Sequence, residues 1–256
     1  MPGLERLRWQ VVLSPALSTH LEMALDEVLL GRLAGGRRGP TLRLWKWAEP
    51  TLIIGSHQVV ANEVDAAEAA RLGFTVTRRM SGGGTMIAEP GRTITYSLYA
   101  PAELVRGLSF VDSFAHFDAW AVACLQGLGV PATYRPINDI VSPAGKIGGA
   151  AQARRGGAVL HHTTIAHQLD PALVPRLIRI GRPALSPRGV RSAEKVVSPL
   201  SAWTTATQAD VTDALAACFK GSHPTGAGEI DDDELAEARA LTEFKYGRQA
   251  WIDRLR

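Results

Sequence analysis

A run of glycines that follows a short apolar segment could bind an anion. Residues 78–84 read Arg-Arg-Met-Ser-Gly-Gly-Gly. Consecutive glycines leave the backbone bare, so Gly82, Gly83 and Gly84 can approach a ligand closely and turn their N–H groups toward a phosphate. Arg79 would add a charged, two-pronged donor. On spacing alone, an ordinary glycine turn between two strands explains the same residues equally well.

A lone lysine among glycines forms a second candidate segment. Lys146 is followed closely by Gly148 and Gly149, so its ammonium has little side-chain cover and can reach a ligand as a point charge. Asp139 could hold Mg²⁺, which prefers one or two carboxylates together with substrate phosphates. The simpler alternative is that Asn138 and Asp139 cap a turn and that the lysine is solvated.

The histidines and cysteines do not indicate a metal site or a nucleophile. His161 and His162 are adjacent on a predicted strand, so they point to opposite faces and cannot converge on one ion. Cys124 and Cys218 fall within predicted helices, without a neighbouring base that would lower a thiol pKa. We interpret both cysteines as small core residues, because two are too few for a disulfide framework. A covalent acyl-enzyme is therefore disfavoured.

Length and composition indicate a soluble protein of ordinary type. The 256 residues suit one large domain, with or without a small appendage. The formal net charge of +3 is too small and too scattered to predict a nucleic-acid partner. Only a short apolar run, residues 11–13, lies near the N-terminus, so we expect no signal peptide or membrane span and a cytoplasmic location.

The elements that must position these segments alternate irregularly. Helices are predicted to begin at five capping positions: Thr19 (with Glu22 as a capping box), Asn62, Ser109, Asp170 and Thr207. Strands are predicted over residues 42–47, 51–54, 74–78, 93–99, 137–141, 146–151 and 159–166. Short turns between several strands favour an α/β fold of the α+β type, with a mixed, largely antiparallel sheet flanked by helices. The long proline-containing loop over 181–201 is a candidate functional segment.

Taken in order, these segments resemble the lipoate–protein ligase A family within the biotin/lipoate ligase superfamily. The resemblance rests on residues 78–84, 138–139, 145–151 and 161–164, with support from 25–27, 54–58 and 189–192. It implies a class II synthetase-like and biotin ligase-like sheet that forms a single catalytic domain over 1–256. The small C-terminal domain of many bacterial members is absent, so full adenylation is expected to need a separate accessory subunit.

The resemblance also implies a two-step activity. Lipoate attacks the α-phosphate of ATP, with Mg²⁺, to give lipoyl-AMP. A lysine of a lipoyl carrier domain then takes the acyl group. The expected carriers are E2 components of 2-oxoacid dehydrogenases or H-type proteins of glycine cleavage, and neither nucleic acid nor membrane is expected as a partner.

Roles can be carried over by position. Lys146 would contact the acyl carbonyl and phosphate oxygens as the catalytic cation, and Asp139 would serve the metal. The residues implied to bind substrate and adenylate are Arg79, Ser81, Gly82, Gly83, Gly84, Asn138, Gly149, Ala151, His162 and Thr164. Candidates for an apolar tunnel around the lipoate tail are Leu44, Trp45, Ile54 and Val76.

Departures from the family pattern keep two alternatives open. Ala88-Glu89 replaces a common His-Asp, the lysine segment lacks two hydroxyl side chains, and Thr163 replaces a glycine. One alternative is an octanoyl- or lipoyl-transferase working through a thioester, which requires a cysteine near the lysine segment, where residues 131–145 have none. The other is a non-catalytic binder of lipoate or of a carrier domain. A Lys146→Ala substitution would separate an enzyme from such a binder.

Overall fold

The computed structural model describes residues 3–256 and contains an eight-stranded sheet. In sheet order its strands are β11 (Thr225–Ala227), β1 (Trp9–Leu17), β2 (Thr41–Trp47), β6 (Thr93–Pro101), β10 (Ala158–Ala166), β9 (Gly145–Arg155), β8 (Asp139–Ser142) and β7 (Thr133–Arg135). The pairings from β2 to β7 are antiparallel, whereas β1 pairs in parallel with both of its neighbours. The predicted mixed, largely antiparallel sheet is confirmed.

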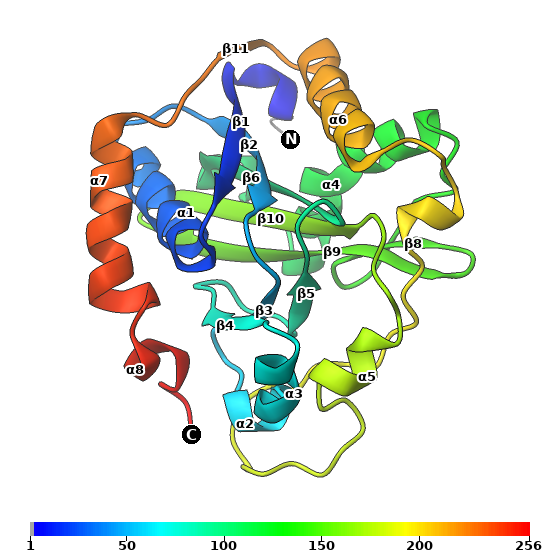
Figure 1. Cartoon of the computed structure of the whole chain (residues 1–256). Coiled ribbons are helices and arrows are strands. Elements are labelled where there is room, and N and C mark those ends of the chain that lie inside the picture. The colour runs from blue at the N-terminus through cyan, green and yellow to red at the C-terminus, as the bar shows by residue number, and fades with distance from the viewer. Residues whose placement is uncertain (1–2) are drawn as a thin grey trace.

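A smaller sheet carries the approach to the glycine segment. It contains β4 (Thr75–Arg78), β3 (Thr51–Ile54) and β5 (Met86–Ala88), in that order. Three short helices, α2 (Val60–Glu63), α3 (Ala66–Arg71) and α5 (Leu173–Leu177), gather at the same end of the molecule (Figure 1). The small sheet and these helices share one apolar cluster that includes Leu52, Ile54 and Leu177.

Helices cover both faces of the large sheet, and two adjacent residues of β10 identify the faces. His161 contacts Asp118 of α4 (Phe110–Gly127), whereas His162 contacts Asp26 of α1 (Thr19–Ala34). Because adjacent strand residues point to opposite faces, α1 and α4 lie on opposite sides of the sheet. The helix α6 (Gln208–Ser222) shares the core of α4. The helix α7 (Asp232–Leu241) packs along α1 (Figure 1).

The remaining helical elements are short. They are α8 (Gln249–Ile252), a π-helical turn (Thr242–Tyr246) and three 3-10 turns (Leu4–Arg6, Ala102–Val105 and Leu200–Ala202). None of the helices in residues 3–256 is long and apolar enough to cross a bilayer.

Two of the five predicted caps, Ser109 and Thr207, are confirmed, and the other three predicted helix starts differ from the structure. Ser109 accepts a hydrogen bond from the N–H of Asp112, and Thr207 forms a full capping box, as predicted. At α1 the N-cap is Ser18, because the side chain of Glu22 turns instead to the buried Arg43 and to the N–H of Leu17. Asp170 is not a cap either, because α5 begins at Leu173 with Ala172 as its N-cap, and the side chain of Asp170 accepts from the N–H of Ala172.

Asn62 was also wrongly predicted as a cap. It lies inside α2, and the following helix α3 is capped by Asp65, whose side chain accepts from the N–H of Glu68. The strand β1 was missed altogether, because the segment 9–17 has no strict alternation and contains Pro15.

The interpretation of the two cysteines was wrong. Cys124 of α4 and Cys218 of α6 form a disulfide, with their Cα atoms 5.9 Å apart across a sequence separation of 94 residues. Cys124 is buried but Cys218 is exposed. Their positions within separate helices gave no indication of the pair, which depends on how α4 and α6 pack on one face of the sheet.

Candidate active site

A cavity of about 550 Å³ brings the candidate segments together. It lies on the His162 face of the large sheet, toward the small sheet, and the loop at 190–197 forms part of its wall. The predicted site residues that line it are Arg79, Gly83, Gly84, Asn138, Asp139, Lys146, Gly149, Ala151, His162 and Thr164. Ser81 and Gly82 belong to the same turn but are not among the lining residues that the structure describes within 3–256.

A β-bulge turns Lys146 into this cavity. Asp139 of β8 is paired with Gly149 of β9. Two residues along β8, Val141 is paired with Lys146, so that Ile147 is an extra residue on β9. Side chains alternate along a strand, and a regular ladder would point Lys146 away from the face that Asp139 shares with Gly149. The bulge therefore places the ammonium and the carboxylate on the same face.

Lys146 shares Asp139 with a second lysine. The Nζ of Lys146 lies 2.7 Å from one carboxylate oxygen, and the Nζ of Lys195 lies 2.9 Å from the other. Burial alone would raise the pKa of Asp139, but the two ammoniums hold that pKa below its usual value. Lys195 was not predicted, since it lies in an irregular loop with no motif of its own.

Gly149 provides the space that the ammonium occupies. A Cβ atom at this position would lie 2.5 Å from the Nζ of Lys146 and 2.8 Å from its Cε. Neither distance is compatible with van der Waals contact. A side chain at this position would therefore force the end of Lys146 to shift from its place beside Asp139.

Arg79 holds the glycine turn in place. Its guanidinium donates to the carbonyls of Gly82 and Gly84 at 2.6 and 2.8 Å, and to the carbonyl of Ile53 at 3.1 Å. Burial lowers the pKa of Arg79 to about 10, which leaves it protonated at neutral pH. Most of its donors are thus already engaged by the protein.

The N–H groups of the turn are available to an anion instead. The carbonyls of Gly82 and Gly84 face Arg79, so the N–H groups of the same two peptide units, those of Gly83 and Thr85, point the other way, and the N–H of Thr85 donates to Ser192. Within residues 3–256, no hydrogen-bond acceptor is assigned to the N–H of Gly82, Gly83 or Gly84. Bare N–H groups of this kind can bind an anion, and the anion nest stays a prediction.

His162 connects the glycine turn to α1. Its Nε2 lies 2.6 Å from the hydroxyl of Ser81, and its Nδ1 lies 2.8 Å from the carboxylate of Asp26. Burial lowers the pKa of His162, so the imidazole is neutral and donates to Asp26 while it accepts from Ser81. This order resembles a catalytic serine relay, but Ser81 is only 1% exposed and is also bonded to Arg79. The chain of contacts therefore supports the turn.

The two histidines lie on opposite faces of the sheet, as predicted. Only His162 faces the cavity, as the alternation of strand residues predicted. His161 lies in the core against Asp118 and stacks on Phe117. Both histidines are buried, because helices cover both faces of the sheet.

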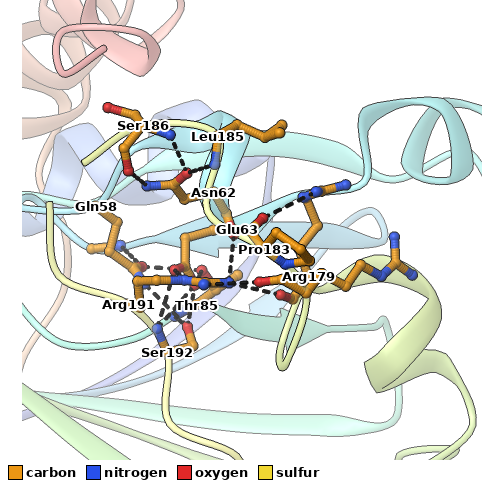
Figure 2. A network of polar contacts seen from close by, with 12 residues as sticks. Gln58, Asn62, Glu63, Thr85, Arg179, Pro183, Leu185, Ser186, Arg191 and Ser192 are labelled. Carbon is orange, nitrogen blue, oxygen red and sulfur yellow. Dashed lines mark hydrogen bonds and ion pairs between the residues drawn. The ribbon is translucent and has the colours of Figure 1, made fainter. Parts of the chain in front are cut away.

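The loop at 181–197 is fastened to α2 and to the glycine turn (Figure 2). The amide of Asn62 accepts from the N–H groups of Leu185 and Ser186. The carboxylate of Glu63 accepts from the N–H of Ser192. The hydroxyl of Ser192 in turn accepts from the N–H of Thr85, directly after the glycines. These bonds fix the part of the loop that lines the cavity.

The apolar part of the cavity lies over β2 and α1. Of the predicted tunnel residues only Trp45 lines it, together with Trp47, which follows two residues later on the same face. Leu44 points to the opposite core, and Ile54 and Val76 pack in the cluster of the small sheet, so these three were wrong. The apolar lining residues that the sequence did not reveal include Met23, Trp47, Ile53 and Met86.

The charges of the cavity favour an anionic ligand. Its described lining contains Lys146, Lys195, Arg79 and Arg191, against the single carboxylate of Asp139. Fixed cations in a partly enclosed site stabilise negative charge. Both oxygens of Asp139 face ammoniums, and no cluster of three potential metal ligands occurs in residues 3–256. The magnesium role of Asp139 stays a prediction.

Comparison with known proteins decides the family. Residues 18–220 match the model of the lipoyl protein ligase A/B catalytic domain. The chain belongs to this family. It is 29% identical to an octanoyltransferase LipM of Symbiobacterium thermophilum over 261 residues, covering 90% of this chain and 92% of that protein. It is 28% identical to the octanoyltransferase LipM of Kyrpidia tusciae, covering 95% of this chain and 97% of that protein.

Solved structures of the family have the same fold. A bipartite lipoate protein ligase of Thermoplasma acidophilum, studied with its E2 lipoyl domain, aligns with a TM-score of 0.80 at 22% identity over 98% of both chains. A lipoate-protein ligase A bound with ATP aligns with a TM-score of 0.79 at 24% identity over all of both chains. The lipoate ligase-type fold that the sequence predicted is confirmed.

Proposed function

We propose that this protein is a lipoate–protein ligase that makes lipoyl-AMP from lipoate and ATP and transfers the lipoyl group to a lysine of a carrier domain. The observation that carries the proposal is one cavity with two chemically different ends. Lys146, Gly83 and Gly84 line its polar part, and the N–H groups of these two glycines have no backbone acceptor within residues 3–256. Trp45, Trp47 and Met23 form an apolar part that suits a lipoate tail.

In the first step a lipoate carboxylate oxygen attacks the α-phosphorus of ATP, and the bond to pyrophosphate breaks. In the second step a carrier amine attacks the acyl carbon, and the bond to AMP breaks. Both transition states place negative charge on phosphate or carbonyl oxygens. We propose that Lys146 and the N–H groups of Gly83 and Gly84 stabilise that charge. Asn138, Ala151 and Thr164 form walls that orient the adenylate.

Magnesium is proposed to enter with ATP as part of the substrate. The described carboxylate in the cavity, Asp139, has both oxygens paired with lysines. The residues present therefore do not fit a resident Mg²⁺ ion. Mg²⁺ commonly keeps its waters and binds chiefly to substrate phosphates.

The proposed acyl acceptors are lipoyl carrier domains, of the E2 type or of the H type, in the cytoplasm. A bipartite ligase and its E2 lipoyl domain are named together for the Thermoplasma acidophilum relative in fold. By the same analogy we propose that residues 1–256 form one catalytic domain that works with a separate small accessory subunit.

Octanoyl transfer is the second candidate function, favoured by the relatives named octanoyltransferase LipM. A thioester route needs a reactive thiol beside the acyl group. Cys124 and Cys218 are instead joined to each other between α4 and α6, on the face of the large sheet opposite the cavity. For this reason we favour the ligase, and a non-catalytic binder is left as the third possibility.

The test is acyl transfer to a purified lipoyl domain, followed by mass spectrometry, from two donor systems. One contains ATP, Mg²⁺ and lipoate, with and without a candidate small subunit, and the other contains an octanoyl carrier protein without ATP. The proposal predicts lipoylation that depends on ATP. Transfer from the octanoyl carrier alone would establish the transferase, and no transfer from either donor with retained lipoate binding would establish the binder.

A further inference from the structure

Lys195 is held beside Lys146 by the backbone. The N–H of Lys146 donates to the carbonyl of Val196, and the N–H of Ser198 donates to the carbonyl of Lys146. These bonds form a parallel bridge between Lys146 and Val197. The loop that carries Lys195 is therefore joined to β9 at the residue that carries the central cation of the site.

The two ammoniums occupy opposite oxygens of one buried carboxylate. The Nζ atoms of Lys146 and Lys195 lie 2.7 and 2.9 Å from Oδ1 and Oδ2 of Asp139. The side chain of Asp139 is only 3% exposed, whereas those of Lys146 and Lys195 are 30% and 44% exposed. Asp139 thus depends on the lysines for its charge compensation, while each lysine can reach water.

A reacting anion would compete with Asp139 for Lys146. The ammonium must turn from the carboxylate if it is to contact the acyl phosphate. If Lys146 were the only cation beside Asp139, its departure would leave a buried, unpaired charge, which strongly destabilises a protein. A second ammonium on the other oxygen removes most of that cost, because the carboxylate stays paired throughout.

We propose that Lys195 is a positioning residue that keeps Asp139 paired while Lys146 turns toward the reacting acyl phosphate. The inference rests on the proposed function for the identity of that anion. The exchange needs no change of the backbone, since the bulge on β9 and the bridge to Val197 hold both lysines in place. Lys195 acts through Asp139 and does not itself contact the substrate.

The kinetic test compares Lys195→Met with Lys195→Arg, Asp139→Asn and the double variant Lys195→Met/Asp139→Asn. The exposed Lys220→Met on α6 is the matched control. The rate of lipoyl-AMP formation should fall about 10- to 100-fold in Lys195→Met with KM for ATP little changed, because the loss lies in the chemical step. Arginine should restore most of the rate, and Lys220→Met should match the wild type. Thermal unfolding checks that each variant is folded.

The double variant decides how Lys195 acts. If Lys195 works through Asp139, adding Lys195→Met to Asp139→Asn changes the rate no further. If the two substitutions instead lower the rate by the product of their separate effects, Lys195 acts on the substrate independently of Asp139. An unchanged rate in Lys195→Met would show that Lys195 has no role in the reaction. Either result overturns the proposal.

A second readout needs no activity. Competitive acetylation with acetic anhydride, followed by mass spectrometry, measures how readily the Lys146 amine reacts. In Lys195→Met the Asp139 carboxylate is paired with Lys146 alone and holds that ammonium more strongly. Acetylation of Lys146 should therefore slow by about threefold or more in Lys195→Met and stay unchanged in Lys220→Met. If Lys195→Met slows acetylation of Lys146 but the wild type makes no lipoyl-AMP, the proposed function is refuted. If the wild type makes lipoyl-AMP but Lys195→Met does not slow acetylation of Lys146, only the role of Lys195 is refuted.

Discussion

Gly149 shows how one missing side chain shapes the site. Its hydrogen leaves room for the ammonium of Lys146, which a methyl group would displace from Asp139. The clash is with the flexible end of a lysine and not with backbone. The effect of a substitution should therefore appear in activity more than in stability.

The first prediction concerns Gly149→Ala. We expect lipoyl-AMP formation to fall by about tenfold or more, since a misplaced cation no longer stabilises the developing charge. The melting temperature should change little. Gly31→Ala in α1 is the control, because a Cβ there meets nothing within 4 Å. A Gly149→Ala variant with the wild-type rate would show that the position of the ammonium does not matter.

The second prediction concerns pH and His162. Burial lowers the pKa of this histidine in the folded protein below its ordinary value of 6.5. As the pH falls, His162 is therefore protonated in the unfolded chain before it is protonated in the folded protein. Its contribution to the free energy of unfolding is fully present above pH 6.5 and is lost as the pH falls below that value. Unfolding by urea at pH 7.5 and 5.5 should show a smaller loss of stability in His162→Gln than in the wild type, by at most about 1.4 kcal/mol per pH unit. Equal losses would contradict the neutral assignment.

At the scale of elements, the loop at 181–197 depends on α2 for its position. The side chain of Asn62 bonds to the backbone of Leu185, Ser186 and Arg188. A helix of four residues thereby becomes the anchor of a long irregular segment. The loop can be ordered without secondary structure of its own.

The third prediction is that Asn62→Ala releases this loop. Several backbone groups lose partners, at about 1–3 kcal/mol for those that stay buried. Hydrogen exchange at residues 185–192 should accelerate, and KM for ATP or lipoate should rise, because the loop lines the cavity. Asn62→Asp keeps the acceptor for Leu185 and Ser186 and should lie between the wild type and Asn62→Ala. Unchanged exchange in Asn62→Ala would refute the anchoring role.

The disulfide between α4 and α6 gives a fourth prediction. Replacing Cys124 or Cys218 with serine should lower the free energy of unfolding by about 2–4 kcal/mol, because the unfolded chain loses its cross-link. The rate of lipoyl-AMP formation below the melting temperature should be retained, since the pair lies on the face away from the cavity. Loss of activity in a folded serine variant would return the thioester route to consideration.

At the scale of the whole molecule, the sequence predicted what depends on local pattern. The strand segments around Lys146 and His162 and the surface caps at Ser109 and Thr207 follow from alternation and capping chemistry. The fold class followed from the short turns between strands. The order of the glycine, lysine and histidine segments indicated the family.

What the sequence did not reveal depends on long-range packing. Nothing in residues 139–149 specifies the bulge that turns Lys146 toward Asp139. The pairing of Lys195 with the same carboxylate arises only when a loop some fifty residues away along the chain docks on β9. The disulfide and the engagement of Arg79 by carbonyls also need coordinates, because they join elements that local pattern cannot place relative to each other.

The most direct measurement of the central claim is single-turnover formation of lipoyl-AMP by the wild type and by Lys146→Ala, with ATP, Mg²⁺, lipoate and the candidate small subunit. If the cavity is an adenylating site, the wild type forms lipoyl-AMP and pyrophosphate in equal amounts. Lys146→Ala should then lose about a thousandfold or more in rate while it remains folded. A wild type that forms no lipoyl-AMP under these conditions, or a Lys146→Ala variant that forms it at the wild-type rate, would contradict the account.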